Sequence, residues 1–186
     1  MPVAIAVAAP DLGRLASSVA IPVIAEHVDA TEPGAHTGFV PPEAVQSAGG
    51  WGSLVNHAEH PVSLGEVARM VHRLKALGMS AVVCGRDIRV ARRIAKDRPP
   101  YLAVEPPELI GGRHSVSTAR PELVSGAVEV VRKVAPGTLV LCGAGVHDRR
   151  DVRRALELGA EGVLVASAVV RAASPRRALE ELLGGY

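Results

Sequence analysis

The chain has 186 residues, of which 48% are apolar, 2% aromatic and 22% charged, with a formal net charge of +2. This length suits one domain, and its core must consist of Ala, Val, Leu and Ile side chains. So few aromatic residues and so small a charge argue against a nucleic-acid partner. No apolar stretch is long enough to span a bilayer, and residues 2–10 lack the basic start of a signal peptide. We therefore expect a cytoplasmic protein with no membrane partner.

Seven short apolar runs are predicted to form strands, in chain order at residues 3–8, 23–26, Gly52–Val55, 81–84, Tyr101–Val104, Leu139–Cys142 and 162–165. Runs of small and β-branched aliphatic residues are typical of parallel strands that are covered on both faces. Cys84 and Cys142 each end one of these runs and form no CxxC pair. We therefore expect two buried thiols in a reducing compartment.

A helix is predicted after the third strand. Ser63 and Glu66 have the spacing of a capping box, in which the hydroxyl and the carboxylate each bind a backbone N–H group at the helix start. The side chains that follow at helical spacing form one apolar face: Leu64, Val67, Ala68, Val71 and Leu74. Gly78 is placed to end this helix.

Further helices are predicted to begin at Pro121, at Asp148 with an end at Gly159, and at Ser174. Strands that alternate with helices imply a parallel sheet with right-handed crossovers. This pattern fits a (β/α)8 barrel, typically about 250 residues, that is short by one or two units, and it also fits an open doubly wound sheet. No GxGxxG turn follows a strand, which removes the usual argument for a dinucleotide fold. Periodicity alone leaves both architectures open.

Functional residues of parallel α/β proteins gather just beyond the carboxyl ends of the strands. There the sequence has Asn56 and His57 after the third predicted strand, Glu105 after the fifth, residues 143–145 after the sixth and residues 166–167 after the seventh. A carboxylate in such a position could move a proton, an imidazole could polarise a carbonyl, and small-residue turns expose backbone N–H groups to an anion.

Four segments carry a resemblance to a known family: PGAHTG at 33–38, NHAE at 56–59, AVEPPELIG at 103–111 and LCGAG at 141–145. In this order they resemble the archaeal-type triose-phosphate isomerases, from about Val3 to the C-terminus. The resemblance implies a TIM (β/α)8 barrel in a single domain, residues 1–186, with seven strand–helix units because the family's first strand and helix have no counterpart here. It also implies interconversion of dihydroxyacetone phosphate and glyceraldehyde 3-phosphate through an enediolate, without a metal or organic cofactor.

The resemblance assigns the roles that are established for this family of enzymes. Glu105 would be the base that moves the proton, and a neutral His57 would be the electrophile at the carbonyl oxygen. Asn56 and Glu59 would support them. Residues 107–112 would form a lid that keeps water from the enediolate. The substrate phosphate would bind to the lid and to the turns after the last two strands, at Ile110, Gly111, Gly145, Ala166 and Ser167.

The sequence departs from the family at its start. The family's first strand ends in an Asn-x-Lys motif that contacts the substrate, whereas Lys75, Lys96 and Lys133 each lie within or at the end of a helical stretch. Loss of a preorganised cation at a developing oxyanion commonly costs a factor of about 10² to 10³ in rate, so we expect feeble activity. A truncated gene model is the favoured explanation. A second chain that completes the enzyme and a non-catalytic binder of small phosphorylated ligands are the alternatives.

Smaller features complete the predictions. Ala58 stands where the family has Ser, and the lid continues through Arg113 and His114, unlike the family's Thr-Gly run. Thr37 lies in a loop that projects into a neighbouring subunit in relatives, which implies a homo-oligomer, either a dimer or a tetramer. The arginines at 149–154 are expected to be a solvated helix face. A metal site is not expected, because no acidic or Cys partner completes a ligand set with the four histidines considered, His27, His36, His57 and His60.

Overall fold

The computed structural model describes residues 2–112 and 114–184. The chain divides into two compact units. We call them the N-terminal unit, residues 2–84 and 97–101, and the C-terminal unit, which has residues 85–96 and those from Leu102 onward. The single-domain organisation expected for residues 1–186 stays a prediction.

Four parallel strands form the centre of the N-terminal unit: β1 (Ile5–Val7), β2 (Val23–Ala25), β3 (Gly52–Val55) and β4 (Ser80–Gly85, whose last residue belongs to the C-terminal unit). They lie side by side in chain order, with Ala6 opposite Ile24, Ile24 opposite Gly52, and Gly52 opposite Ser80. A Cβ added at Gly52 would lie 2.9 Å from the Ser80 carbonyl carbon, so only glycine fits where β3 meets β4.

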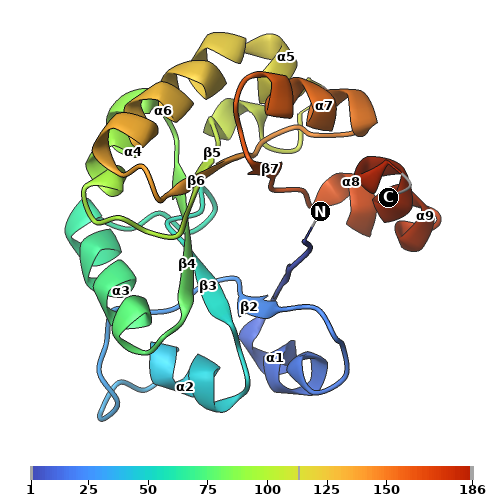
Figure 1. Cartoon of the computed structure of the whole chain (residues 1–186). Helices are drawn as coiled ribbons and strands as arrows, with labels where there is room; N and C mark the ends of the chain where they lie inside the picture. Colours follow the sequence, from blue (N-terminus) through green and yellow to red (C-terminus); the bar gives the residue numbers. More distant parts are fainter. Residues whose placement is uncertain (1, 113, 185–186) are drawn as a thin grey trace. The chain divides into compact units, whose positions relative to one another are not determined.

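Three helices flank these strands, α1 (Ala9–Ala16), α2 (Pro42–Ser47) and α3 (Leu64–Ala76) (Figure 1). The capping box predicted for α3 is confirmed, because the Glu66 N–H donates to Ser63 Oγ at 3.2 Å and the Ser63 N–H donates to Glu66 Oε2 at 2.9 Å. Two bonds satisfy two N–H groups that the helix cannot pair internally. The buried face of α3 consists of Val67, Met70, Val71 and Leu74. Gly78 follows with a φ of +70°, as predicted for a helix end.

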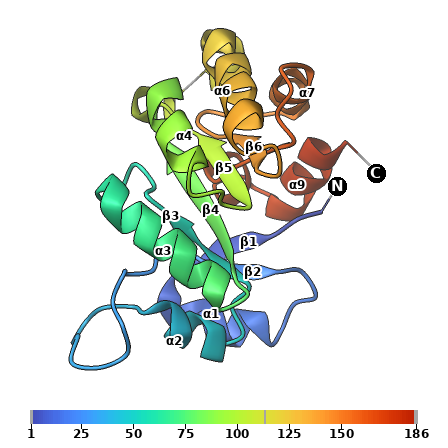
Figure 2. The same ribbon diagram turned by 60° about the vertical axis from the view of Figure 1, so that its left-hand side comes forward.

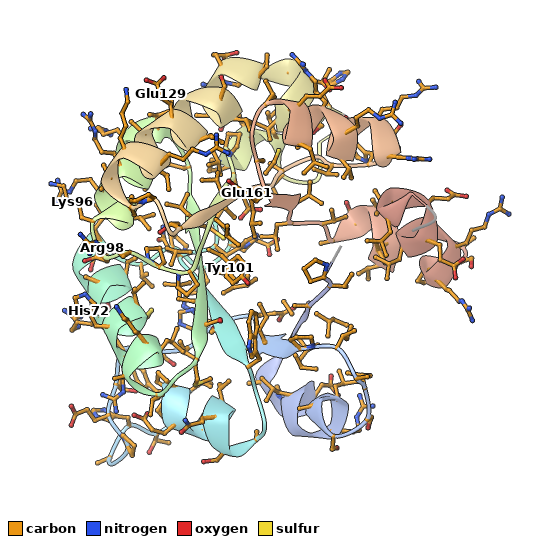
Figure 3. The ribbon with its side chains drawn as sticks, viewed as in Figure 1. His72, Lys96, Arg98, Tyr101, Glu129 and Glu161 are labelled. Carbon is orange, nitrogen blue, oxygen red and sulfur yellow. The ribbon has the colours of Figure 1, made fainter. Side chains whose placement is uncertain are left out.

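The strands of the C-terminal unit also lie in chain order: β5 (Tyr101–Val104, whose first residue belongs to the N-terminal unit), β6 (Leu139–Cys142) and β7 (Gly162–Val163). Glu161 fixes β7 beside β6, because its N–H donates to the Val140 carbonyl and its carboxylate accepts from the Val140 N–H, both at 2.8 Å. The same carboxylate binds Arg132 at 3.0 Å; Glu161 is labelled in Figure 3.

The helices described in this unit are α4 (Ile88–Ala95), α5 (Val116–Ala119), α6 (Pro121–Val134), α7 (Arg149–Glu157), α8 (Ser167–Val170) and α9 (Pro175–Leu183), and residues Pro107–Leu109 form a 3-10 turn, η1. Helices α4 and α6 pack side by side (Figure 2). Gly126 permits this approach, since an added Cβ would lie 2.7 Å from Ile88 Cδ1. The predicted starts at Pro121, Asp148 and Ser174 are confirmed.

All seven predicted strands are present, with three bounds unchanged and four shifted. β1 and β2 are shorter than predicted, and β7 has two residues instead of four, whereas β4 is longer by one residue at each end. Leu164 is held beyond the end of β7 by a single backbone bond to Cys142, so an apolar run continues there without a ladder. Within the described residues, no helix is both long enough and apolar enough to cross a membrane.

Candidate active site

The turn after β3 is held by the side chain of Asn56. Its backbone has a φ of +61°, a left-handed conformation that Asn tolerates better than most residues. Its Nδ2 donates to the Cys84 carbonyl at the end of β4 at 2.8 Å, and its Oδ1 accepts from the Val62 N–H at 3.0 Å. One half-buried amide therefore joins the ends of two strands to the residue that precedes the cap of α3.

His57 follows in this turn with its side chain 21% exposed. The Glu59 N–H donates to His57 Nδ1 at 3.3 Å. The Glu59 carboxylate is 3.7 Å from the same nitrogen, beyond hydrogen-bond range, so the backbone contact decides which ring nitrogen accepts. In a neutral ring the proton is then on Nε2, and His57 presents an N–H donor there. This tautomer is the one that the predicted electrophile needs.

Of the predicted site residues in the N-terminal unit, Asn56, His57 and Glu59 share this one turn. Glu59 extends into solvent, with its side chain 83% exposed, and what reaches His57 by a hydrogen bond is its backbone N–H. The supporting role of its carboxylate stays a prediction.

Two other histidines of this unit stack on each other. The rings of His27 and His60 have centroids 3.8 Å apart and an angle of 12° between their planes. Burial, together with the neighbouring His60, lowers the pKa of His27 against the opposing effect of Asp29. The pair lines a cavity of about 440 Å³ with Glu26 and Thr37. No group of three or more His, Cys, Asp or Glu side chains in the described part of the chain could hold a metal ion.

In the C-terminal unit, Glu105 follows β5 and is 5% exposed. Its N–H donates to the Gly85 carbonyl at 2.9 Å, and the Gly143 N–H donates to the carbonyl of Val104, the residue before it, at 3.1 Å. The carboxylate packs directly against Gly143, where an added Cβ would lie 2.6 Å from Glu105 Cδ. The absent side chain of Gly143 thus provides the space that the Glu105 carboxylate occupies.

Residues 107–112, the predicted lid, form a compact loop that begins with η1. The Ile110 N–H donates to the Pro107 carbonyl at 3.3 Å, and the Gly112 N–H donates to the Leu109 carbonyl at 3.0 Å. Gly111 has a φ of +66°. In this arrangement the Ile110 N–H is used inside the lid, so binding a phosphate there requires the lid turn to open. Arg113, which was predicted to continue the lid, lies outside the described residues.

Gly145 lies in a tight turn after β6. Ala144 and Gly145 have φ values of +68° and +69°. A Cβ added at Gly145 would overlap the His114 carbonyl oxygen and lie 3.1 Å from the Leu109 carbonyl oxygen. The turn therefore lies against the lid and the residue that follows it, and only glycine permits this approach.

The last predicted phosphate-binding residues, Ala166 and Ser167, form the start of α8. Backbone N–H groups in the first turn of a helix have no partner within the helix and favour anions. Because β5, β6 and β7 are parallel neighbours, Glu105, Gly145 and Ala166 follow the same ends of three adjacent strands. The structure thus gathers these predicted site residues of the C-terminal unit at one edge of its sheet.

Charged groups elsewhere are as expected. Lys75, Lys96 and Lys133 are exposed on or at the ends of helices and do not follow strands. Figure 3 labels Lys96 at the outer end of α4. The arginines at 149–154 are exposed, as predicted. Three of them line an open cleft of about 920 Å³ together with Glu180 and Glu181, so its lining carries both signs of charge.

Sequence reasoning missed two contributors to this site. The steric role of Gly143 depends on a residue 38 positions away in the chain, Glu105, and no local pattern reveals it. His147, two residues after Gly145, contacts the lid through Nε2, which is 2.7 Å from the Gly112 carbonyl oxygen. The sequence signal that could have indicated this role is a histidine just beyond a turn of small residues.

Comparison with known proteins is consistent with this geometry. A family model described as "Triosephosphate isomerase" matches residues 1–182. A triosephosphate isomerase of Methanosarcina acetivorans is 43% identical over 97% of this chain and 82% of its own length. Those of Cenarchaeum symbiosum and Methanothermobacter thermautotrophicus are 49% and 44% identical, over 86% and 93% of this chain and 72% and 76% of their own lengths. The match confirms the barrel fold class over the doubly wound alternative.

Proposed function

The chain belongs to the triosephosphate isomerase family, and from this premise we propose that it interconverts dihydroxyacetone phosphate and glyceraldehyde 3-phosphate. One observation carries the proposal beyond the family match. A buried carboxylate, Glu105, follows a parallel strand beside a glycine turn and directly before the loop of residues 107–112. Such a group, shielded from water and held by packing, suits the removal of a proton from carbon.

Glu105 is the base in this proposal. Its carboxylate takes a proton from C1 of dihydroxyacetone phosphate, the electron pair of the C–H bond forms the C1–C2 double bond of an enediolate, and the carbonyl oxygen gains the negative charge. The proton of the C1 hydroxyl is transferred to the C2 oxygen, the same carboxyl group returns its proton to C2, and the C1 oxygen becomes the aldehyde carbonyl. Its contact with Gly143 keeps the carboxylate in place, because the surrounding atoms leave it little room to move.

His57 is the electrophile. Its Nε2–H, which the Glu59 backbone contact favours, donates to the carbonyl oxygen as charge develops there. Asn56 orients the turn that carries His57 through its bonds to Cys84 and Val62.

The phosphate binds to backbone N–H groups. Gly145, Ala166 and Ser167 follow adjacent strands and provide N–H donors without a charged side chain. Ile110 and Gly111 complete the set once the hydrogen bond from the Ile110 N–H to the Pro107 carbonyl is broken. The lid then covers the enediolate and keeps water from it.

A pair of substitutions tests these roles. Glu105→Gln keeps size and packing but removes the base, and we expect kcat to fall by about 10² to 10⁴-fold. His57→Gln should lower kcat by about 10² to 10³-fold. Matched controls are Glu129→Gln and His72→Gln, whose side chains lie on α6 and α3 (Figure 3), and which should keep wild-type activity. Equal activity of all four variants in an isomerisation assay would refute the proposal.

We also propose that the protein is a homo-oligomer, a dimer or a tetramer, that functions in cytoplasmic glycolysis and gluconeogenesis. Residues 33–39 are exposed, and Phe39, 53% exposed, packs edge-on against His36 with ring centroids 6.0 Å apart. An exposed aromatic beside Thr37 suits contact with a second copy. Cys84 and Cys142 are buried and do not form a disulfide, which suits a reducing compartment. Light scattering after size exclusion should show an assembly that Phe39→Ser weakens; a wild-type monomer would refute it.

A further inference from the structure

A hydrogen bond joins the lid to the turn after β6. His147 Nε2 lies 2.7 Å from the carbonyl oxygen of Gly112, the last described residue of the lid. A carbonyl oxygen can only accept, so Nε2 carries the proton and the imidazole donates. Both the neutral Nε2–H tautomer and the charged ring can make this bond, so protonation does not break it.

The backbone of His147 is anchored where α7 begins. Its N–H donates to Asp151 Oδ2 at 2.9 Å, and the Asp151 N–H is bonded to the cap residue Asp148 at 3.1 Å. On the other side of Asp151, its carbonyl accepts from Ser117 Oγ in α5, the helix that follows the lid. His147 is thus a donor held on a helix start and directed at a loop.

The lid has few other ties to the rest of the C-terminal unit. Its own N–H groups at Leu109, Ile110 and Gly112 donate to carbonyls within residues 106–109. Among the described residues, the other polar tie of the lid is the ion pair of Glu108 with Arg120, in which both side chains are about half exposed. Exposed ion pairs contribute little. Among the described lid residues, the His147 bond is the polar tie that holds the lid backbone itself, at Gly112, whereas the ion pair holds only the Glu108 side chain.

The restraint favours one state of the lid. While Gly112 is held by His147, the Ile110 N–H is bonded to Pro107 and is not available to a phosphate. Gly112 lies two residues beyond the 107–110 turn, so opening this turn displaces Gly112 and stretches its hydrogen bond to His147. The hydrogen bond therefore stabilises a resting lid over a lid that binds phosphate.

We propose that His147 is a positioning residue that latches the lid of this isomerase in its resting position, and that substrate binding breaks the latch. The inference rests on the proposed function, because it assigns the loop its role as a lid. The latch reduces the apparent affinity for a phosphorylated ligand by the factor by which it favours the resting state. One net hydrogen bond corresponds to a factor of about 2 to 10.

Hydrogen exchange on the ligand-free protein tests the latch without reference to catalysis. In His147→Phe, which keeps a ring but has no donor, the lid N–H groups of Leu109, Ile110 and Gly112 should exchange about 2 to 10-fold faster than in the wild type. His147→Gln restores an N–H donor and should return exchange to the wild-type rate. His72→Phe is the matched control, since His72 is an exposed histidine on α3, outside the lid, and it should leave exchange of the lid unchanged.

Binding and kinetics then show what the latch does. Calorimetry with 2-phosphoglycolate should give a Kd about 2 to 10-fold lower for His147→Phe, and KM should fall by a similar factor while kcat changes less than twofold. Unchanged exchange in His147→Phe, or weaker ligand binding, would overturn the latch. If wild-type protein shows no isomerisation while exchange responds as described, the proposed function fails and the latch stands.

Discussion

Replacing Gly143 by alanine is the sharpest test of how the carboxylate of Glu105 is positioned. The added methyl group would lie 2.6 Å from Glu105 Cδ and nearer still to Cγ and Oε1, whereas ordinary contacts begin near 3.4 Å, so the side chain must retreat by at least about 0.8 Å. Glu105 is 5% exposed, so this displacement pushes it against packed neighbours. A shift near 1 Å in a catalytic group can cost about 10²-fold in rate.

We therefore expect Gly143→Ala to lower kcat by about 10²-fold and the free energy of unfolding by about 1 to 3 kcal/mol, the usual cost of overpacking. Gly143 has no positive φ, so backbone strain does not contribute. The matched control is Gly137→Ala, where an added Cβ has no atom within 4 Å and φ is also not positive.

Isomerisation kinetics and urea denaturation of the three proteins measure both effects. If Gly143→Ala keeps kcat within threefold of the wild type, the contact with Gly143 does not position the base, and this reasoning is refuted. A Gly137→Ala variant as impaired as Gly143→Ala would mean that any alanine in this unit disturbs the site.

Three further predictions follow from local chemistry. Ser63→Ala should lower the free energy of unfolding by about 1 kcal/mol in urea titrations, because it removes the cap of α3. Hydrogen bonds to Ser63 lower the pKa of Glu66, so the stability advantage of the wild type should fade as the pH falls below the ordinary pKa of 4.5. An advantage that is unchanged at pH 3 would contradict this. Asn56→Ala should lower kcat and destabilise the fold by about 1 to 3 kcal/mol, because the Cys84 carbonyl and the Val62 N–H lose their partner and Ala tolerates a φ of +61° less well. Asn56→Asp should destabilise less than Asn56→Ala, and calorimetric unfolding of the two variants measures the difference. Burial raises the pKa of the Cys142 thiol to about 12, so this thiol should resist alkylation at pH 8 until the protein unfolds. The free energy of unfolding should fall as the pH rises above the ordinary pKa of 9, because there only the thiol of the unfolded chain ionises. Rapid labelling of Cys142 in the native protein, detected by mass spectrometry, would contradict this.

The sequence predicted best those features that depend on neighbours in the chain. The capping box of α3 requires two residues three positions apart, and the helix starts at Pro121 and Asp148 have equally local signals. The central residues of the strands were also predictable, because a run such as Tyr101–Val104 is apolar whichever strand it pairs with. Strand ends were less predictable: residues 164–165 continue the apolar run of β7 but lie beyond its ladder.

The candidate site divides in the same way. Glu105, His57 and the glycine turn were predicted as site residues because they follow apolar runs and match the motifs of the family, and their roles stay predictions. The tautomer of His57 could not be identified, since it depends on the direction of the Glu59 N–H. The Ile110 N–H was predicted to be available to a phosphate, but the folded lid uses it in a turn of its own.

The sequence by itself thus determined the order of strands and helices, the helix caps and the residue types at the strand ends, because each depends on interactions within a few positions. Only the tertiary structure decided that Gly143 makes room for Glu105 and that His147 binds Gly112, contacts between residues 38 and 35 positions apart in the chain. Such contacts form when parallel strands bring distant loops to one edge of a sheet. A short stretch of sequence carries no record of which loop will lie opposite.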